Sequence, residues 1–180
     1  MRLVILGAGG HGQVVADLAE QCGNYDSILF LDDGKDSSDG LNNVVGPCCD
    51  YVKYIDDETE FYPGFGNNKA RLEWEEKLLS EGAALAKIIH PLAYISPKAE
   101  VAEGCVVMPY AVVNTGCIVE KACIINCGAI LDHGSHLEPG CHLAPAAIVK
   151  AENHIAGCTK VDSGEIIPVR EFYDPDFKYK

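Results

Sequence analysis

Aliphatic residues recur at every sixth position through the second half of the chain, from Ile89 to Ile167. This spacing matches neither the period of a helix nor that of a strand. A six-residue period is typical of a β-solenoid, in which each repeat forms a short strand and a turn and the stacked coils bury a continuous core. The pattern therefore predicts a solenoid over residues 86–167, built on Ile89, Ile95, Val101, Val107, Val113, Val119, Ile125, Leu131, Leu137, Leu143, Val149, Ile155, Val161 and Ile167.

A small residue follows most of these aliphatic positions four residues later. We expect this small position to face the interior of the solenoid. Some of the cysteines stand there, and a buried thiol behaves as a compact hydrophobic group. We therefore expect these cysteines to pack in the core; they are Cys105, Cys117, Cys123 and Cys141.

The first part of the chain has a different pattern, in which short apolar runs alternate with Gly-rich turns and with segments whose apolar residues recur with the period of a helix. Such alternation predicts a small α/β unit with an open parallel sheet. We expect residues 1–85 to form this Rossmann-like domain and residues 168–180 to form a C-terminal tail. The expected strands are Leu3–Leu6, residues 27–33, Tyr51–Ile55 and Glu60–Tyr62; the expected helices cover Val14, Val15, Leu18 and Ala19, then Asn68–Gly82; residues 34–46 are expected to be loop.

Composition excludes several classes of protein. A hydrophobic content of 48% suffices for a real core in 180 residues. The net charge of −13 argues against nucleic-acid binding, and a phosphate-bearing ligand would need backbone N–H groups or a few well-placed cations. The sequence shows no apolar run long enough for a transmembrane helix and no signal peptide. The spacing of its nine cysteines suggests no disulfide framework. We expect a cytoplasmic protein with reduced thiols that contacts neither nucleic acid nor membrane.

The segment Gly7–Gly12 has the spacing G-x-G-x-x-G between a predicted strand and helix, and Asp32 follows after the next strand. Its small residues would let a phosphate approach the helix N-terminus, and the acid could accept hydroxyl or base N–H groups. A dinucleotide such as NAD, another nucleotide, or a tight turn without a ligand all fit this motif. A unit of about 85 residues is short for a complete dinucleotide-binding domain.

The chain resembles the hexapeptide-repeat sugar acyltransferases of the sialic acid O-acetyltransferase and bacillosamine-pathway type. The resemblance rests on GAGGHGQVVAD, FLDD, GFGNN with Arg71, IIHPLAYIS and NCGAILDHGSHLEPGCHLAP. It implies a left-handed parallel β-helix with three repeats per coil, a homotrimer, and acetyl-CoA in the groove between neighbouring β-helices. It also implies a nucleotide-activated sugar, with its phosphates near Gly9, Gly10, His11 and Gly12 and its nucleoside near Asp32 and Asp33.

The stretch 126–142 is dense in potential metal ligands. With three repeats per coil, however, residues six apart lie on different sides of the solenoid, and only positions eighteen apart stack. Of the histidines, only His136 and His154 should therefore meet, and two histidines do not complete a zinc site. We expect no metal and give these two histidines a structural role.

Acetyl transfer from a thioester needs a base for the attacking amine or hydroxyl, and a neutral imidazole suits that task. By resemblance, His133 is the general base, His142 lies near the thioester carbonyl, and Asn126 contacts the sugar. Lys150 and Lys160 are candidates for the CoA phosphates, although both could equally be solvated surface residues. Because four of the six cysteines in the predicted solenoid are expected in the core, direct transfer is favoured over an acetyl-cysteine intermediate.

Two departures from the family pattern bear on activity. The family usually has an acid directly after the catalytic histidine, whereas this chain has Gly134 there and Asp132 before it. Its later small positions become Asn153, Thr159 and Glu165, which predicts a fading end to the solenoid. A UDP-4-amino sugar is the first candidate acceptor, and sialic acid or its CMP form is the second. The alternatives are a non-catalytic sugar-nucleotide-binding protein that has lost the CoA site and an acetyltransferase for a small amino acid.

Overall fold

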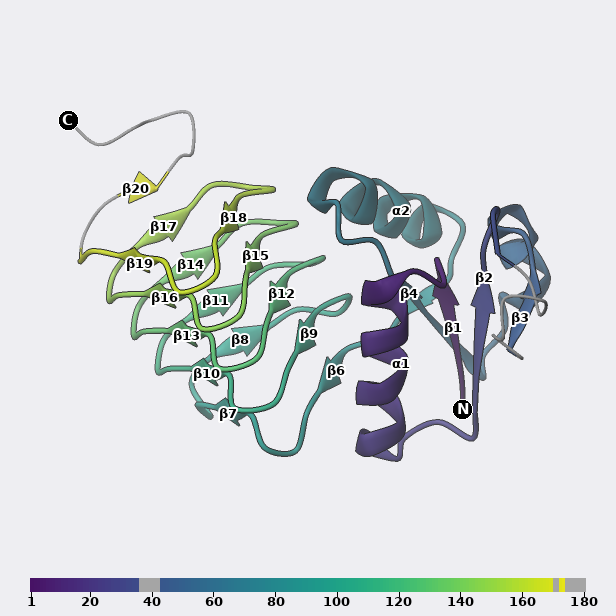
Figure 1. Cartoon of the computed structure of the whole chain (residues 1–180), viewed down its shortest axis with the longest axis horizontal. Coiled ribbons are helices and arrows are strands. Elements are labelled where there is room, and N and C mark those ends of the chain that lie inside the picture. Colours follow the sequence, from purple (N-terminus) through teal and green to yellow (C-terminus); the bar gives the residue numbers. More distant parts are fainter. Residues whose placement is uncertain (36–42, 170–171, 174–180) are drawn as a thin grey trace. The chain divides into compact units, whose positions relative to one another are not determined.

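The computed structural model describes residues 1–35, 43–169 and 172–173. The chain divides into two compact units, Met1–Ala86 and Lys87–Lys180 (Figure 1). Part of the expected loop (residues 36–42) and most of the expected tail (residues 170–171 and 174–180) lie outside the described residues. No helix in the described part of the chain is long and apolar enough to cross a membrane.

The first unit is built on a parallel five-stranded sheet of order β3-β2-β1-β4-β5. Its central strand is buried along Leu3–Leu6, as expected for a parallel sheet covered on both faces. This confirms the first predicted strand. The strands are β1 (Arg2–Leu6), β2 (Ser27–Leu31), β3 (Val44–Gly46), β4 (Thr59–Pro63) and β5 (Ala84–Leu85), and the helices are α1 (Gly10–Cys22), the 3₁₀ helix η2 (Cys48–Tyr54) and α2 (Asn68–Ser80).

Both predicted helices are confirmed. Helix α1 buries Val15, Leu18 and Ala19, whereas Val14 is exposed on its outer face. The side chain of Asn67 caps helix α2 by accepting a hydrogen bond from the amide of Ala70.

Two local predictions are wrong. The segment Tyr51–Ile55 was expected to be a strand, but it lies mostly in η2, whose start is held by a hydrogen bond from the Cys48 amide to Asp33. The amide of Asp50 donates to the Pro47 carbonyl at 3.0 Å, which is the 3₁₀ pattern. The expected loop also ends in a strand, since Val44–Gly46 pairs with the edge of β2. That pairing is a tertiary contact that the local polar composition does not reveal.

The second unit consists of three five-stranded parallel sheets, each formed by every third strand. Val113 on β10 thus pairs with Leu131 on β13, eighteen positions later, so three repeats make one coil, as the resemblance implied. The strands are β6 (Ile88–Ile89), β7 (Tyr94–Ile95), β8 (Glu100–Val101), β9 (Val106–Val107), β10 (Val112–Val113), β11 (Ile118–Val119), β12 (Ile124–Ile125), β13 (Ile130–Leu131), β14 (His136–Leu137), β15 (His142–Leu143), β16 (Ile148–Val149), β17 (His154–Ile155), β18 (Lys160–Val161), β19 (Ile166–Ile167) and β20 (Phe172–Tyr173).

From β6 to β19, the second residue of each strand points into the solenoid, and these residues form one continuous core with the small positions. The four cysteines expected in the core are all fully buried there, which confirms that prediction: Cys105, Cys117, Cys123 and Cys141. All nine cysteines of the chain are free thiols.

The predicted weakening of the late coils is wrong at two of its three positions. Asn153 and Thr159 are buried, and regular strands continue through β19. The Asn153 side-chain amide fits inside because it donates to the carbonyls of Lys150 at 2.9 Å and Pro168 at 2.6 Å. A polar side chain whose hydrogen bonds are satisfied internally is compatible with a regular coil.

The turn between β1 and α1 depends on the absence of a side chain at Gly12. A Cβ there would lie 2.0 Å from the Gly7 carbonyl oxygen, whereas a Cβ on Gly10 would meet nothing within 4 Å. We therefore expect Gly12→Ala to lower the unfolding free energy of the first unit by at least about 2 kcal/mol, because packed backbone would have to move. Fluorescence of Trp74, the single tryptophan, reports thermal unfolding of this unit. Gly10→Ala is the matched control, and equal melting temperatures for the two variants would contradict the prediction.

Candidate functional site

The first unit has a cavity of about 470 Å³ beside the Gly-rich turn. Helix α1 begins at this turn with no acid in its first turn and no side-chain cap, so its N-terminal partial positive charge is available to an anion. The lining residues are Gly7, Gly9, Gly10, His11, Asp32, Gly64, Phe65, Gly66, Asn67 and Ala70. The residues predicted to lie near the phosphates are therefore at or next to one cavity.

The Asp32 carboxylate, which lines this cavity, accepts hydrogen bonds from the backbone of two chain segments. One carboxylate oxygen accepts the amide of Ala8 at 2.7 Å, and the other accepts the amides of Gly34 at 2.8 Å and Lys35 at 2.9 Å. Partial burial acts to raise the pKa of Asp32, but these hydrogen bonds and the Lys35 charge outweigh it and lower the pKa. Asp32 thus fastens the loop after β2 to the turn after β1.

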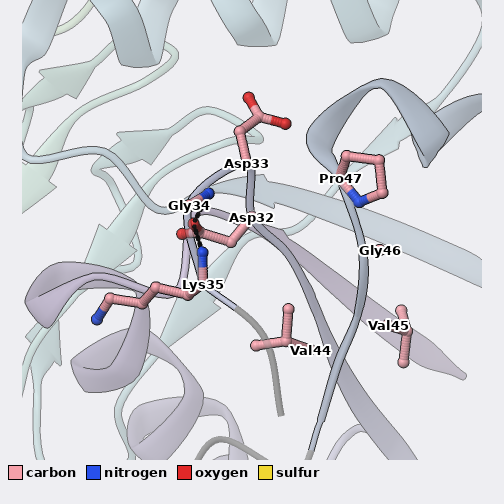
Figure 2. A pocket seen from close by; sticks show the side chains of 8 residues that line it. All are labelled: Asp32, Asp33, Gly34, Lys35, Val44, Val45, Gly46 and Pro47. Atoms are coloured by element: carbon pink, nitrogen blue, oxygen red, sulfur yellow. Dashed lines mark hydrogen bonds between the residues drawn. The ribbon is translucent and has the colours of Figure 1, made fainter. Parts of the chain in front are cut away.

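A second cavity, of about 490 Å³, shares Asp32 and extends along residues 32–35 and 44–47. Figure 2 shows the Asp33 carboxylate and the Lys35 ammonium group pointing away from each other. Asp33 accepts the amide of Cys48 at 2.8 Å, which fixes the start of η2. Lys35 Nζ donates to the Ala8 carbonyl at 3.1 Å, so a cation lies at the Gly-rich turn. Lys35 was not among the residues predicted from the sequence. The signal that could have identified it is a lysine close after two acids, in a chain with few basic residues.

The loop that closes the first cavity is held by Arg71, whose side chain is fully buried. Its guanidinium group donates to the Phe65 carbonyl at 3.0 Å and to the Asn68 side chain at 2.9 Å. On the opposite wall, His11 Nε2 lies 3.0 Å from the hydroxyl oxygen of Tyr62. Tyr62 is a second residue that the sequence analysis did not single out.

In the second unit, Asn126 and His142 come together. Asn126 Oδ1 accepts the amide of Cys127 at 2.8 Å, which orients the side chain so that its Nδ2 faces His142 Nε2 at 3.2 Å. Because an amide nitrogen only donates, Nε2 of His142 accepts. In this arrangement Nε2 of His142 faces Asn126, and Nδ1 is buried.

His133 lies in the exposed turn between β13 and β14. Its amide donates to Asp132 Oδ1 at 2.7 Å, and the Asn114 side chain donates to the same oxygen at 3.1 Å. Asp132 therefore bonds the backbone of His133. Within the described residues, the His133 imidazole makes no hydrogen bond, while every other histidine side chain has a partner.

The residue after His133 is a glycine and contributes no side chain. Gly134 has a left-handed backbone with φ +67°, and a Cβ there would lie 3.6 Å from Cγ of Glu152 in the next coil. The Glu152 amide donates to the His133 carbonyl at 2.9 Å. Glu152, an acid from the following coil, thus lies against Gly134. The resemblance leads us to expect an acid at position 134 itself.

Within one chain, the predicted site residues of the second unit separate into two groups. His133 lies at the edge between the sheet of β13 and the sheet of β14, whereas His142 belongs to the third sheet, with β15. In a three-sided coil, that edge is opposite the third sheet. The structure therefore joins Asn126 to His142 and places His133 on the other side of the solenoid.

The remaining predicted residues have simple surroundings. Lys160 stacks on His142 in the β15–β18 ladder and forms an ion pair with Asp162 at 2.9 Å, and Lys150 is exposed. His136 and His154 stack with ring centroids 4.6 Å apart, which confirms that prediction.

The two stacked histidines are each held by a carboxylate, His136 by Glu120 at 2.6 Å and His154 by Glu138 at 2.7 Å. Hydrogen bonds from the Gly157 amide and from His154 lower the pKa of Glu138. No group of three or more His, Cys, Asp or Glu side chains converges to hold a metal ion in the part of the chain that the structure describes.

Comparison with known proteins identifies the family. The sequence profile of the PglD N-terminal domain matches residues 2–78. The acetyltransferase domain of PglB from Neisseria gonorrhoeae FA1090, solved with acetyl coenzyme A, is 32% identical, with a TM-score of 0.78, over 92% of this chain and 86% of that chain. The chain belongs to the bacillosamine-pathway acetyltransferases.

Two further proteins are similar to this chain. PerB from Caulobacter crescentus, solved with CoA and GDP-perosamine, is 26% identical, with a TM-score of 0.80, over 96% of this chain and 90% of that chain. The UDP-N-acetylbacillosamine N-acetyltransferase of Bacillus subtilis (strain 168) is 29% identical over 109 residues, or 59% of this chain and 50% of that enzyme. The match thus spans half the length of this curated relative. The left-handed β-helix expected from the resemblance is confirmed by these neighbours.

The hydrogen bonds of Asp32 predict an acid-sensitive loss of stability. Asn at this position would turn an N–H group toward the backbone amides, so we expect Asp32→Asn to destabilise the first unit by about 1–3 kcal/mol at neutral pH. A carboxylate with a lowered pKa stabilises above its unfolded-state pKa of about 3.9, and this contribution disappears as pH falls through the folded-state pKa. Urea unfolding at several pH values should show the deficit shrinking in acid. Asp17→Asn, on the exposed face of α1, is the control, and a deficit independent of pH would contradict this explanation.

Proposed function

We propose that this protein transfers the acetyl group of acetyl-CoA to the amino group of a nucleotide-activated sugar. The observation that carries the proposal is the 32% identity, over 92% of the chain, to an acetyltransferase domain solved with acetyl coenzyme A. PerB, which was solved with GDP-perosamine, supports an amino sugar as acceptor. A UDP-4-amino sugar is the first candidate, and a sialic acid is the second. The reaction is assigned to the cytoplasm.

We assign nucleotide-sugar binding to the first unit and acetyl transfer to the second. The cavity at Gly9, Gly10, His11 and Gly12 binds the diphosphate of the sugar nucleotide, and the adjoining cavity at Asp32 and Asp33 takes its nucleoside. Residues 1–85 thus form the nucleotide-sugar-binding domain, residues 86–167 the acetyltransferase domain, and residues 168–180 the tail.

In the reaction, the sugar amine attacks the thioester carbonyl, a C–N bond forms, and the C–S bond breaks to release the thiol of CoA. His133 accepts the proton that the amine loses. An imidazole whose ring is not held by other hydrogen bonds suits a group that must take up a proton from the acceptor. Two acids lie beside this turn: Asp132 accepts the His133 amide, and Cγ of Glu152 lies against Gly134.

The donor side is formed by His142 and Asn126. The side-chain nitrogen of Asn126 faces Nε2 of His142 and so orients the ring. Because His142 Nδ1 is buried within one chain, we propose that the pair lines the donor side next to the thioester carbonyl, without a hydrogen bond from Nδ1 to the oxyanion. Lys150 and Lys160 are the cations proposed for the CoA phosphates. Direct transfer is supported by burial, which raises the pKa of Cys117 and Cys123 and keeps these thiols protonated.

We propose a homotrimer, because base and donor side lie on opposite sides of one solenoid. A head-to-tail contact around a threefold axis brings His133 of one copy to His142 of the next. The sheet between these two regions, β19-β16-β13-β10-β7, supports this packing. Its outward positions form an aliphatic and aromatic column that suits a buried interface: Tyr94, Val112, Ile130, Ile148 and Ile166.

Loss of the base should abolish turnover. We expect His133→Ala to lower kcat by about 10²–10⁴-fold while nucleotide-sugar affinity stays unchanged. Release of the CoA thiol, measured with UDP- and GDP-linked 4-amino sugars, checks this. His90→Ala is the control, at a histidine of the same unit outside the proposed site; its Nδ1 accepts the Leu92 amide at 3.0 Å. Nucleotide-sugar binding without thiol release by the wild type would favour a non-catalytic binding protein, and thiol release only with a small amino acid would favour the other alternative.

A site shared between copies can be tested by mixing two inactive variants. His133→Ala and His142→Ala chains carrying different tags should each be inactive alone. Heterotrimers purified by both tags should recover about one third of the wild-type activity, because one of their three sites combines an intact His133 with an intact His142. Heterotrimers without activity would contradict a shared site.

A further inference from the structure

The pair formed by His11 and Tyr62 connects the Gly-rich turn to the interior of the first unit. His11 Nε2 lies 3.0 Å from the Tyr62 hydroxyl oxygen, and the two rings meet edge to face with centroids 5.9 Å apart. His11 is half-buried and lines the cavity beside the turn, whereas Tyr62 is fully buried and does not line it. Tyr62 therefore lies behind His11 as seen from the cavity.

The backbone around this pair leaves little freedom to adjust. Tyr62 is on β4, in register with Ile5 of β1. A Cβ on Gly64 would lie 2.8 Å from Cα of Gly12, so the end of β4 is in close contact with the start of α1. Because the two backbones are fixed at this distance, the hydroxyl group of Tyr62 fixes the ring of His11.

This contact decides what His11 offers to a ligand. A phenol that donates to Nε2 leaves the hydrogen of the neutral imidazole on Nδ1. Nδ1 is then a donor. The opposite tautomer would present a lone pair, which repels the oxygens of an anion.

The neighbouring groups favour an anion at this place. His11 stands in the first turn of α1, where no acid is present, and the Lys35 ammonium group lies against the Ala8 carbonyl in the same turn. In a chain with a net charge of −13, such a local concentration of donors is what a diphosphate requires.

We propose that Tyr62 is a positioning residue that holds His11 with Nδ1–H as the donor to the diphosphate of the sugar nucleotide. The inference rests on the proposed function, because it takes a nucleotide-linked sugar as the ligand of this cavity. It adds a residue outside the cavity, which acts only through His11.

Calorimetric titration of the full-length protein with UDP and GDP, and with uridine and guanosine as phosphate-free counterparts, tests this. Tyr62→Phe keeps the ring and removes only the hydroxyl group. We expect it to weaken binding of whichever diphosphate the wild type binds by about tenfold, with nucleoside binding unchanged. His11→Ala should cause a similar loss, and Tyr62→Phe should add nothing further in the His11→Ala background, because Tyr62 acts through His11.

Tyr51→Phe is the matched control. Tyr51 is also a buried tyrosine of the first unit, but its hydroxyl group donates to Glu81. It should bind the diphosphate like the wild type. The ¹⁵N shifts of the His11 ring nitrogens give a second readout, and we expect the hydrogen on Nδ1 in the wild type and a mixture of tautomers in Tyr62→Phe.

The outcomes separate the inference from the proposed function. If neither UDP nor GDP binds the wild type, the proposed nucleotide-sugar acceptor is wrong, and the inference is wrong with it. If the wild type binds but Tyr62→Phe binds equally well, or if the losses of the two variants add, only the inference is overturned. A wild-type His11 with its hydrogen on Nε2 would also overturn it.

Discussion

The pairing of each two-residue strand with the strands eighteen positions before and after it controls the whole second unit. Every coil supplies one strand to each of three sheets, so an outward side chain on a strand lies directly beside the side chains eighteen positions before and after it. This constraint stacks His136 on His154 and places Glu152 against Gly134. It also keeps His133 and His142 apart, although they are close in sequence. Any chemistry that needs both must therefore involve a second copy of the solenoid.

The first unit depends on a different constraint, the close approach of backbone segments around the Gly-rich turn. Gly12 and Gly64 let α1 and the end of β4 pack against β1, and Asp32 joins the resulting turn to the loop after β2. The carboxylate expected to meet a nucleoside is occupied by three backbone amides. The ligand-facing groups are then the start of α1, His11 and Lys35, all of which suit phosphate.

In both units, hydrogen bonds from neighbouring side chains orient histidine rings. His142 is fixed by Asn126, His11 by Tyr62, and the stacked pair by Glu120 and Glu138. Each of these partners holds the imidazole ring in one orientation. Among the described residues, the His133 imidazole alone makes no such hydrogen bond, which is consistent with a group whose partner is the acceptor amine.

The sequence by itself determined the solenoid, its core positions and the α/β unit, because these follow from periods that local burial imposes on every repeat. It also identified the Gly-rich turn and, through resemblance, the candidate residues. It did not predict η2 or β3, since these depend on hydrogen bonds to Asp33 and to the edge of β2. Only the tertiary structure decided which of the candidate side chains meet. The repeat predicts the strand register, as the stacking of His136 on His154 shows, but not which side-chain atoms meet across it or where a helix lies against a strand. The contacts of Asn126 with His142 and of Tyr62 with His11 are of that kind.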